Sequence, residues 1–117
     1  MTIRGPAALL LGLSAALAGT ASRAETPRSW VGFVTDTHCG TNCQRTADMK
    51  PDPDCVRECV RKGSKYGLWY MHHVYELTPQ SKAKRFAAEN VRVKGWMEND
   101  VLHIESIAPV PLEASAH

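Results

Sequence analysis

The sequence lacks an apolar run of the roughly 20 residues that a membrane-spanning helix needs. Its longest run, from Ala7 to Ala18, is shorter, follows the charged Arg4 and precedes Ser22-Arg23-Ala24, with small residues at −3 and −1. This arrangement predicts a signal peptide at 1–24 that is removed on export. We therefore expect a periplasmic or secreted protein without stable membrane insertion, whose remaining 93 residues (117 less 24) form one small domain.

A surplus of either charge is also missing. Arg4 and Arg23 leave with the signal, so Lys plus Arg falls from 14 to 12 and equals the 12 Asp plus Glu. The one local basic cluster, Lys82, Lys84 and Arg85, is typical of the solvated face of a short helix. Nucleic-acid binding needs a broader basic stripe, so we expect no nucleic-acid partner.

Catalytic motifs are absent as well. There is no C-x-x-C pair of the kind that thiol–disulfide catalysts use, and no nucleophile–base or carboxylate pair stands out. His38 adjoins Cys39, but adjacent side chains rarely point at each other, so His38 is interpreted as a solvated loop residue. Asp36 and Asp54 suit turn and capping roles. We predict a protein that is not an enzyme and has no catalytic residues and no cofactor.

What the sequence does have is four cysteines in two C-x3-C pairs, Cys39/Cys43 and Cys55/Cys59. After export, even-numbered cysteines usually pair covalently. Two nested bonds, Cys39–Cys59 and Cys43–Cys55, would join the pairs. The outer loop alone is worth roughly 3 kcal/mol by chain-entropy reasoning, which matters to a domain this small.

The alternative is a periplasmic protein that binds zinc or copper through the four thiolates, with His38 as a further ligand. Zinc sites more often use C-x2-C knuckles, and export oxidises thiolates, so disulfides are favoured. The pair His72-His73, with Met71, is a second candidate site for copper or nickel. Histidines at a hairpin tip are more often simply solvated.

The first half of the mature chain predicts a strand, a tied loop and a helix. The strand covers Ser29 to Thr35, where Gly32 indicates a bend or bulge. The irregular stretch from Asp36 to Asp54 holds Cys39 and Cys43. A helix capped by Asp52 or Asp54 then runs to Gly63, with Val56 and Val60 facing the core.

The second half predicts two hairpins with a short helix between them. The first, Lys65 to Leu77, turns at His72-His73 through a four-residue loop, because His-His suits a type I′ turn poorly. That register pairs Tyr70 with Tyr75 and Leu68 with Leu77. Ser81 caps a helix to about Ala88, with Ala83, Phe86 and Ala87 inward. The last hairpin joins Asn90–Met97 to Val101–Ile107, with Val91, Val93, Leu102 and Ile104 inside.

The element order predicts a mainly β fold, α+β by element count. Five strands with a helix between the third and fourth match a small OB-fold-like barrel, here with two short helices and a disulfide-tied loop. A five-stranded α+β roll has the same linear order. We expect a single domain at 25–108 and a disordered tail at 109–117, which is rich in proline and small residues.

Aromatic and sulfur side chains fall on the outer faces of both hairpins. In an OB-fold, the outward surface around the second and third strands is the usual ligand platform. This pattern predicts a shallow face for a glycan, peptide or protein partner, formed by Trp69, Met71, Trp96 and His103. The alternative is that these residues pack beneath the cysteine loop.

Short motifs are spread over nearly the whole mature chain: Trp30-Val31-Gly32-Phe33-Val34-Thr35-Asp36-Thr37-His38-Cys39-Gly40, Cys55-Val56-x-x-Cys59-Val60, Gly63, Tyr66, Val74-Tyr75-x-Leu77, Phe86-Ala87 and Val91-x-Val93-x-Gly95. Together they resemble a family of small exported bacterial proteins known mainly as a domain of unknown function. Ala88 stands where that family often has Gly. The resemblance implies an exported β-barrel-like domain and supplies no activity.

Overall fold

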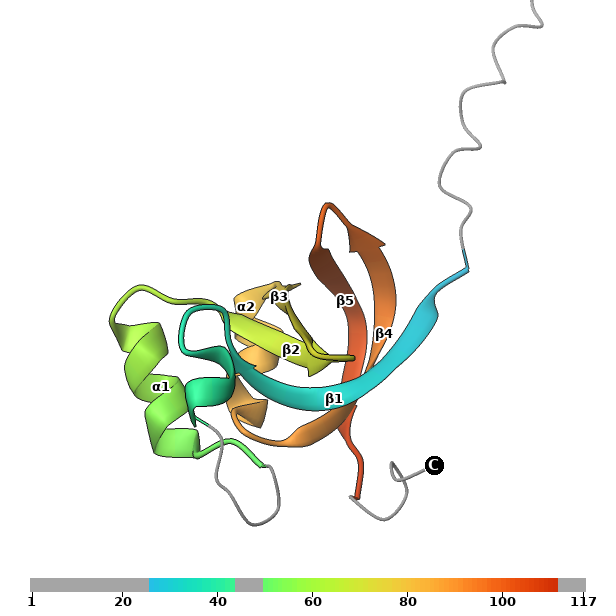
Figure 1. Cartoon of the computed structure of the whole chain (residues 1–117). Coiled ribbons are helices and arrows are strands. Elements are labelled where there is room, and N and C mark those ends of the chain that lie inside the picture. The colour runs from blue at the N-terminus through green and yellow to red at the C-terminus, as the bar shows by residue number, and fades with distance from the viewer. Residues whose placement is uncertain (1–25, 44–49, 112–117) are drawn as a thin grey trace, which may run out of the picture.

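The protein folds as a closed five-stranded barrel in the order β1-β2-β3-β5-β4. A computed structural model describes residues 26–43 and 50–111. Neighbouring strands are antiparallel except β3 and β5, which run parallel, and α2 lies in the chain between β3 and β4. Figure 1 shows the long β1 curving across the barrel, with α1 beyond its end. The predicted OB-like barrel is confirmed.

The first strand, β1 (Arg28–Asp36), closes the barrel because it pairs with two neighbours. Its first part pairs with β4 and its second part with β2, and Phe33 is opposite both Asn90 and Trp69. A Cβ at Gly32 would lie 2.2 Å from the Trp69 carbonyl oxygen, so Gly32 serves close approach of two strands. The sequence indicated a bend or bulge at Gly32, but among the described strand pairs the register shift lies between Lys94 and Gly95 on β4.

The interior is filled from all five strands and from both helical segments. Side chains of alternate residues point inward along each strand, as the pleat requires. The helices add Val56 from α1 and Ala83 from α2, each with no exposed surface. The apolar strand residues with no exposed surface are Val34, Leu68, Leu77, Val91, Val93 and Leu102. The predicted inner face of the last hairpin is therefore confirmed, with Ile104 also buried.

The hairpin of β2 (Tyr66–Tyr70) and β3 (His73–Thr78) differs from the prediction at its tip. Tyr70 pairs with His73 and Leu68 with Tyr75, so the loop has two residues, Met71 and His72. Both adopt left-handed φ angles of 52° and 66°, as a type I′ turn requires. The predicted four-residue loop was wrong. The shift is two residues, so each side chain keeps its predicted face.

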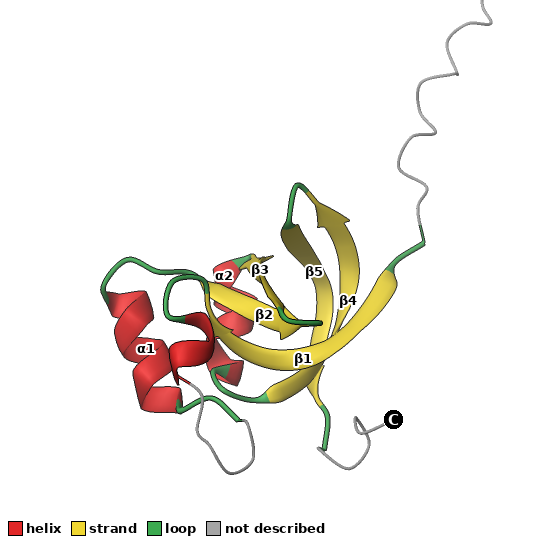
Figure 2. Ribbon diagram, in the orientation of Figure 1, coloured by secondary structure: helices red, strands yellow, loops and turns green. Residues whose placement is uncertain are grey.

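The first helix, α1 (Pro53–Arg61), forms as predicted. Asp52 is its N-cap and accepts a hydrogen bond from the Asp54 N–H, and Gly63 follows the helix at a φ of 114°. The 3-10 turn η2 (Gly40–Cys43) contacts α1 (Figure 2). Cys55 and Cys59, one turn apart, thus face the cysteines that follow β1.

The second helical segment is shorter than predicted. It consists of α2 (Gln80–Ala83) and the 3-10 turn η3 (Lys84–Phe86). Pro79, not Ser81, precedes α2, and no side chain caps it. The expected inward residues Ala83 and Ala87 are buried and Phe86 is half-buried. The segment is followed by Ala88 at a φ of 67°, a left-handed conformation at the position where Gly was noted above.

The last hairpin pairs β4 (Asn90–Glu98) with β5 (Val101–Pro109) through a turn at Asn99-Asp100. β5 runs past residue 108, where the domain was expected to end. Val110 is buried, and it exchanges hydrogen bonds with Asn90, whose side-chain amide donates to the Val110 carbonyl over 3.1 Å. The rest of the expected tail, 112–117, and the signal segment lie outside the described residues.

Candidate functional site

The strongest covalent feature is a pair of nested disulfides. Cys39 is bonded to Cys59 and Cys43 to Cys55, with Cα separations of 6.5 and 5.5 Å. The predicted connectivity is confirmed. Because the bonded cysteines are separated by 20 and 12 positions in the sequence, each bond taken alone stabilises the fold by about 3 kcal/mol in the chain-entropy model. They tie α1 and η2 to each other beside the end of β1, and they indicate an oxidising environment.

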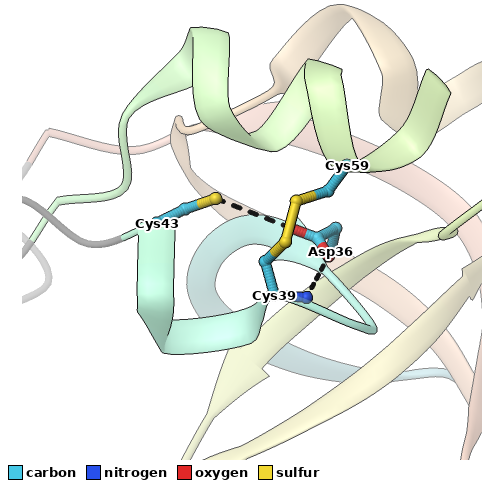
Figure 3. Close-up of side chains that lie close together, drawn as sticks. All are labelled: Asp36, Cys39, Cys43 and Cys59. Atoms are coloured by element: carbon cyan, nitrogen blue, oxygen red, sulfur yellow. Dashed lines mark hydrogen bonds between the residues drawn. A yellow bond between two sulfur atoms is a disulfide. The ribbon is translucent and has the colours of Figure 1, made fainter. Parts of the chain in front are cut away.

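A buried carboxylate organises the start of this loop. Asp36 ends β1 with no exposed surface, and its Oδ1 accepts hydrogen bonds from the His38 N–H (2.9 Å), the Cys39 N–H (2.6 Å) and the Ser64 hydroxyl (2.9 Å). Figure 3 shows the carboxylate close beside the Cys39–Cys59 bond, with Cys43 to the left of both. Three donors on one oxygen offset the cost of burying the charge. Asp36 therefore does more than the turn role predicted for it, because it also bonds to Ser64, 28 residues further along the chain.

The second oxygen of Asp36 faces sulfur. Its Oδ2 lies 3.9 Å from the Cys43 Sγ, which carries no hydrogen while the disulfide is intact, so the approach is a contact. A carboxylate oxygen of Asp36 and three sulfur atoms lie within 4.8 Å of one another; the sulfur atoms belong to Cys39, Cys43 and Cys59. Asp36 thus takes the place that the predicted four-thiolate site gave to Cys55. While both disulfides are intact, no thiolate of this cluster is free to bind a metal.

The outer disulfide borders an open pocket of about 650 Å³. Cys39 and Cys59 form part of its wall together with Thr37, Lys62 and Ser64. His38 lies there too and is exposed, and its backbone N–H, not its ring, makes the bonds to Asp36 and Ser64. The structure therefore provides no base directed at a nucleophile among these residues.

The outer face of β1 and β2 forms a second, shallower hollow of about 310 Å³. Trp69 and Met71 contribute to it, as the expected ligand face required. Sequence reasoning missed Phe33, the cross-strand partner of Trp69 on β1. Strand alternation already placed Phe33 on the outer face, because its neighbour Val34 points into the core. We call this hollow the Trp69 surface; it is lined by Val31, Gly32, Phe33, Trp69, Met71, His72 and Asn90.

Trp96 and His103 lie elsewhere. They are directly opposed on β4 and β5, and His103 Nε2 lies 3.5 Å from the Glu98 carboxylate. Trp69 pairs with Phe33 on β1, whereas Gly95, which precedes Trp96, pairs with Arg28 on the same strand. Phe33 and Arg28 are five residues apart. At about 3.4 Å per residue this separates the two tryptophans by about 17 Å along the strand. The four residues of the expected ligand face therefore form two separate pairs.

Of the cysteine loop the structure describes 36–43 and 50–54, and in that part Gly40 approaches Val74 on β3, whose Cγ2 would lie 3.9 Å from a Cβ on Gly40. At the hairpin tip, the His73 ring packs on Tyr75 with 4.2 Å between centroids, whereas His72 belongs to the Trp69 surface. The two histidines thus face different surroundings, which is unfavourable for one shared metal ion.

Comparison with protein-family models, with curated proteins and with solved structures gave no match. Among residues 26–43 and 50–111, no helix has the length and apolar character needed to span a membrane.

Proposed function

We propose that this protein is an exported, non-enzymatic binding domain that recognises a partner protein through the Trp69 surface. The observation that carries the proposal is the exposure of Met71, which is 75% accessible at the tip of the β2–β3 hairpin. It adjoins the half-buried Trp69 and Phe33 on the outer face of an OB-like barrel, where this fold ordinarily binds ligands.

The conformation of Met71 supports a role other than folding. Met71 and His72 have φ angles of 52° and 66°, a region that Asn and Gly adopt at lower cost than a long side chain. An exposed methionine in this turn gives the barrel no buried contact in return. Strained backbone that adds nothing to packing is often found at functional sites.

The chemistry of the Trp69 surface favours a protein over a small molecule or a glycan. Its lining is mainly aromatic, aliphatic and methionine, with His72 and Asn90 as its polar members, and it contains no Asp, Glu, Lys or Arg. Enrichment in Trp, Phe and Met with depletion of charge is typical of the centre of protein interfaces. Small-molecule sites are more enclosed, and they carry convergent polar groups.

The export component rests on two independent features. The sequence at 1–24 has the order of a signal peptide, and the two disulfides require an oxidising environment to persist. Membership of the exported family of unknown function is part of the same proposal. Intact mass spectrometry of the protein from the exported fraction should give a chain that begins at Glu25. Its mass should be about 4 Da below that of the fully reduced chain, because each of the four thiols loses one hydrogen. A full-length, reduced chain would contradict export.

Site-specific photo-crosslinking in the exporting cell tests the binding face. A photoreactive residue at position 72 should give an adduct of one defined mass, because His72 lies at the Trp69 surface. The substitution Met71→Glu should abolish that adduct while leaving the melting temperature nearly unchanged, since Met71 is exposed. The same photoreactive residue at the exposed Lys94 on β4 is the control. No protein adduct at 72, or identical adducts at 72 and 94, would refute the proposal.

A second candidate function is metal binding in the reduced state, favoured by the convergence of Asp36, Cys39, Cys43 and Cys59. Three thiolates and a carboxylate form a plausible tetrahedral zinc site. Zinc titration of the reduced protein should then show one equivalent bound. Asp36→Asn should weaken binding, and Cys55→Ser should leave it intact. Equal dependence on Cys55 would contradict this donor set, and metal-free protein from the exported fraction would exclude the function.

A further inference from the structure

A third hollow lies between the two helical segments, on a different part of the molecule from the Trp69 surface. Its volume is about 510 Å³, within the range of small-molecule sites. α1 contributes Arg57, Val60 and Arg61, while α2 and its extension contribute Ser81 and Lys84. We call it the α1–α2 pocket; Tyr66 and Gln80 complete its lining.

The charged residues of this lining are all of one sign. Arg57, Arg61 and Lys84 are exposed, and no Asp or Glu belongs to the lining. The acidic partners of the two arginines lie on the α1 surface: Asp54 is 4.0 Å from Arg57, and Glu58 pairs with Arg61. Arg61, which hydrogen-bonds to Glu58, holds the pKa of that carboxyl below its usual range, and Lys62 contributes. Such exposed pairs are weak, so an anionic ligand can displace them.

The wall of the pocket is partly apolar and already rigid. Val60 and Tyr66 supply the apolar surface, and both pack with the barrel core. The Gln80 side chain is held by three hydrogen bonds: its amide nitrogen donates to the Leu77 and Tyr66 carbonyls, and its oxygen accepts from the Tyr66 N–H. Gln80 thus fixes α2 against β2. Two guanidinium groups therefore project from one helix turn opposite Lys84, beside a preformed apolar wall.

We propose that the α1–α2 pocket binds a small organic anion whose oxyanion group lies between Arg57, Arg61 and Lys84 and whose apolar part contacts Val60 and Tyr66. Guanidinium groups match the planar, two-point geometry of phosphate and carboxylate oxygens, and Lys84 adds a point charge. Ser81 offers a hydroxyl as a further donor. The site is independent of the Trp69 surface, which contains none of these residues.

Calorimetric titration of the oxidised, signal-free protein with phenyl phosphate tests this site. We expect saturable binding that weakens as salt increases. The double substitution Arg57→Gln/Lys84→Gln should reduce affinity by about tenfold or more, because it removes two of three charge-assisted contacts. The matched control, Arg92→Gln/Lys94→Gln, removes the same charge from exposed β4 positions and should leave affinity within about twofold. Equal losses in both variants, or no saturation at low salt, would overturn the proposal.

Three further measurements test the parts of the assignment separately. Glu58→Gln removes the carboxylate that competes for Arg61 and should raise affinity for phenyl phosphate. Inorganic phosphate should bind more weakly than phenyl phosphate; equal binding would overturn the role of Val60 and Tyr66. Phenylacetate in the same assay distinguishes the two oxyanions, and the tighter binder shows which of them the three cationic side chains prefer. Binding of neither would overturn the site.

Discussion

The carboxylate of Asp36 accepts a hydrogen bond of 2.6 Å from the backbone N–H of Cys39. This bond joins the last residue of β1 to the first cysteine of the disulfide unit. The same oxygen accepts from the Ser64 hydroxyl, which lies beyond α1 in the chain. One buried side chain therefore links the barrel, the 3-10 turn that follows it and the return of the chain into β2.

Removal of this acceptor should destabilise the fold more than loss of any single donor. Asp36→Ala leaves three donors without their partner and should lower the free energy of unfolding by about 3 kcal/mol. Ser64→Ala removes one of these donors, while the His38 N–H that also bonds to Ser64 keeps its bond to Asp36, so this change should cost about 1 kcal/mol. Urea denaturation of the oxidised proteins measures both. Similar losses in the two variants would show that the Asp36 network does not act as a unit.

The two disulfides should differ in their accessibility to a reductant. Cys39 and Cys59 border an open pocket, whereas Cys43 is only 1% exposed. Because thiol–disulfide exchange requires a thiolate to reach a sulfur atom, brief treatment with a mild thiol should open Cys39–Cys59 first. Alkylation followed by peptide mass analysis identifies the first bond to open. If Cys43–Cys55 opens first or both open together, the pocket does not control access.

Ala88 offers a stabilising substitution. Its φ of 67° favours glycine, and the left-handed conformation costs a residue with a Cβ roughly 1–2 kcal/mol. Loss of one buried methyl group offsets up to about 0.8 kcal/mol of that gain, so Ala88→Gly should stabilise the protein by about 0.5 kcal/mol. The neighbour Ala87 has a φ of −52°, and Ala87→Gly should destabilise by about 1 kcal/mol. Thermal unfolding that gives both changes the same sign would contradict the conformational explanation.

The Met71-His72 turn should show a conflict between stability and binding. Replacing the pair by Asn-Gly suits the two left-handed positions and should raise the free energy of unfolding by about 1 kcal/mol. The same change removes two contacts from the Trp69 surface, so the adduct formed by a photoreactive residue moved to position 31, another lining position, should decrease. Undiminished crosslinking in the stabilised variant would separate the turn from the binding face.

Local sequence determined the elements and their faces. Alternating apolar residues predicted both hairpins, and a register shift of two residues at Met71-His72 left Leu68 and Leu77 inside, because side chains repeat every second residue. The spacing of Cys55 and Cys59 on one helix face, together with the second C-x3-C pair, was enough to predict the nested bonds. These features follow from local periodicity and from pairings between segments close in the chain, with a sequence separation of at most 20 between the bonded cysteines.

Only the tertiary structure decided which distant residues meet. Barrel closure placed Phe33 beside Trp69 and left the hairpin pair Trp96 and His103 apart from them, because β1 pairs with β2 and β4 at different ends. It also buried Asp36 against the disulfides. A strand pattern says which face a residue occupies, but strand order and curvature decide its neighbours on that face, and both arise from closure of the whole sheet.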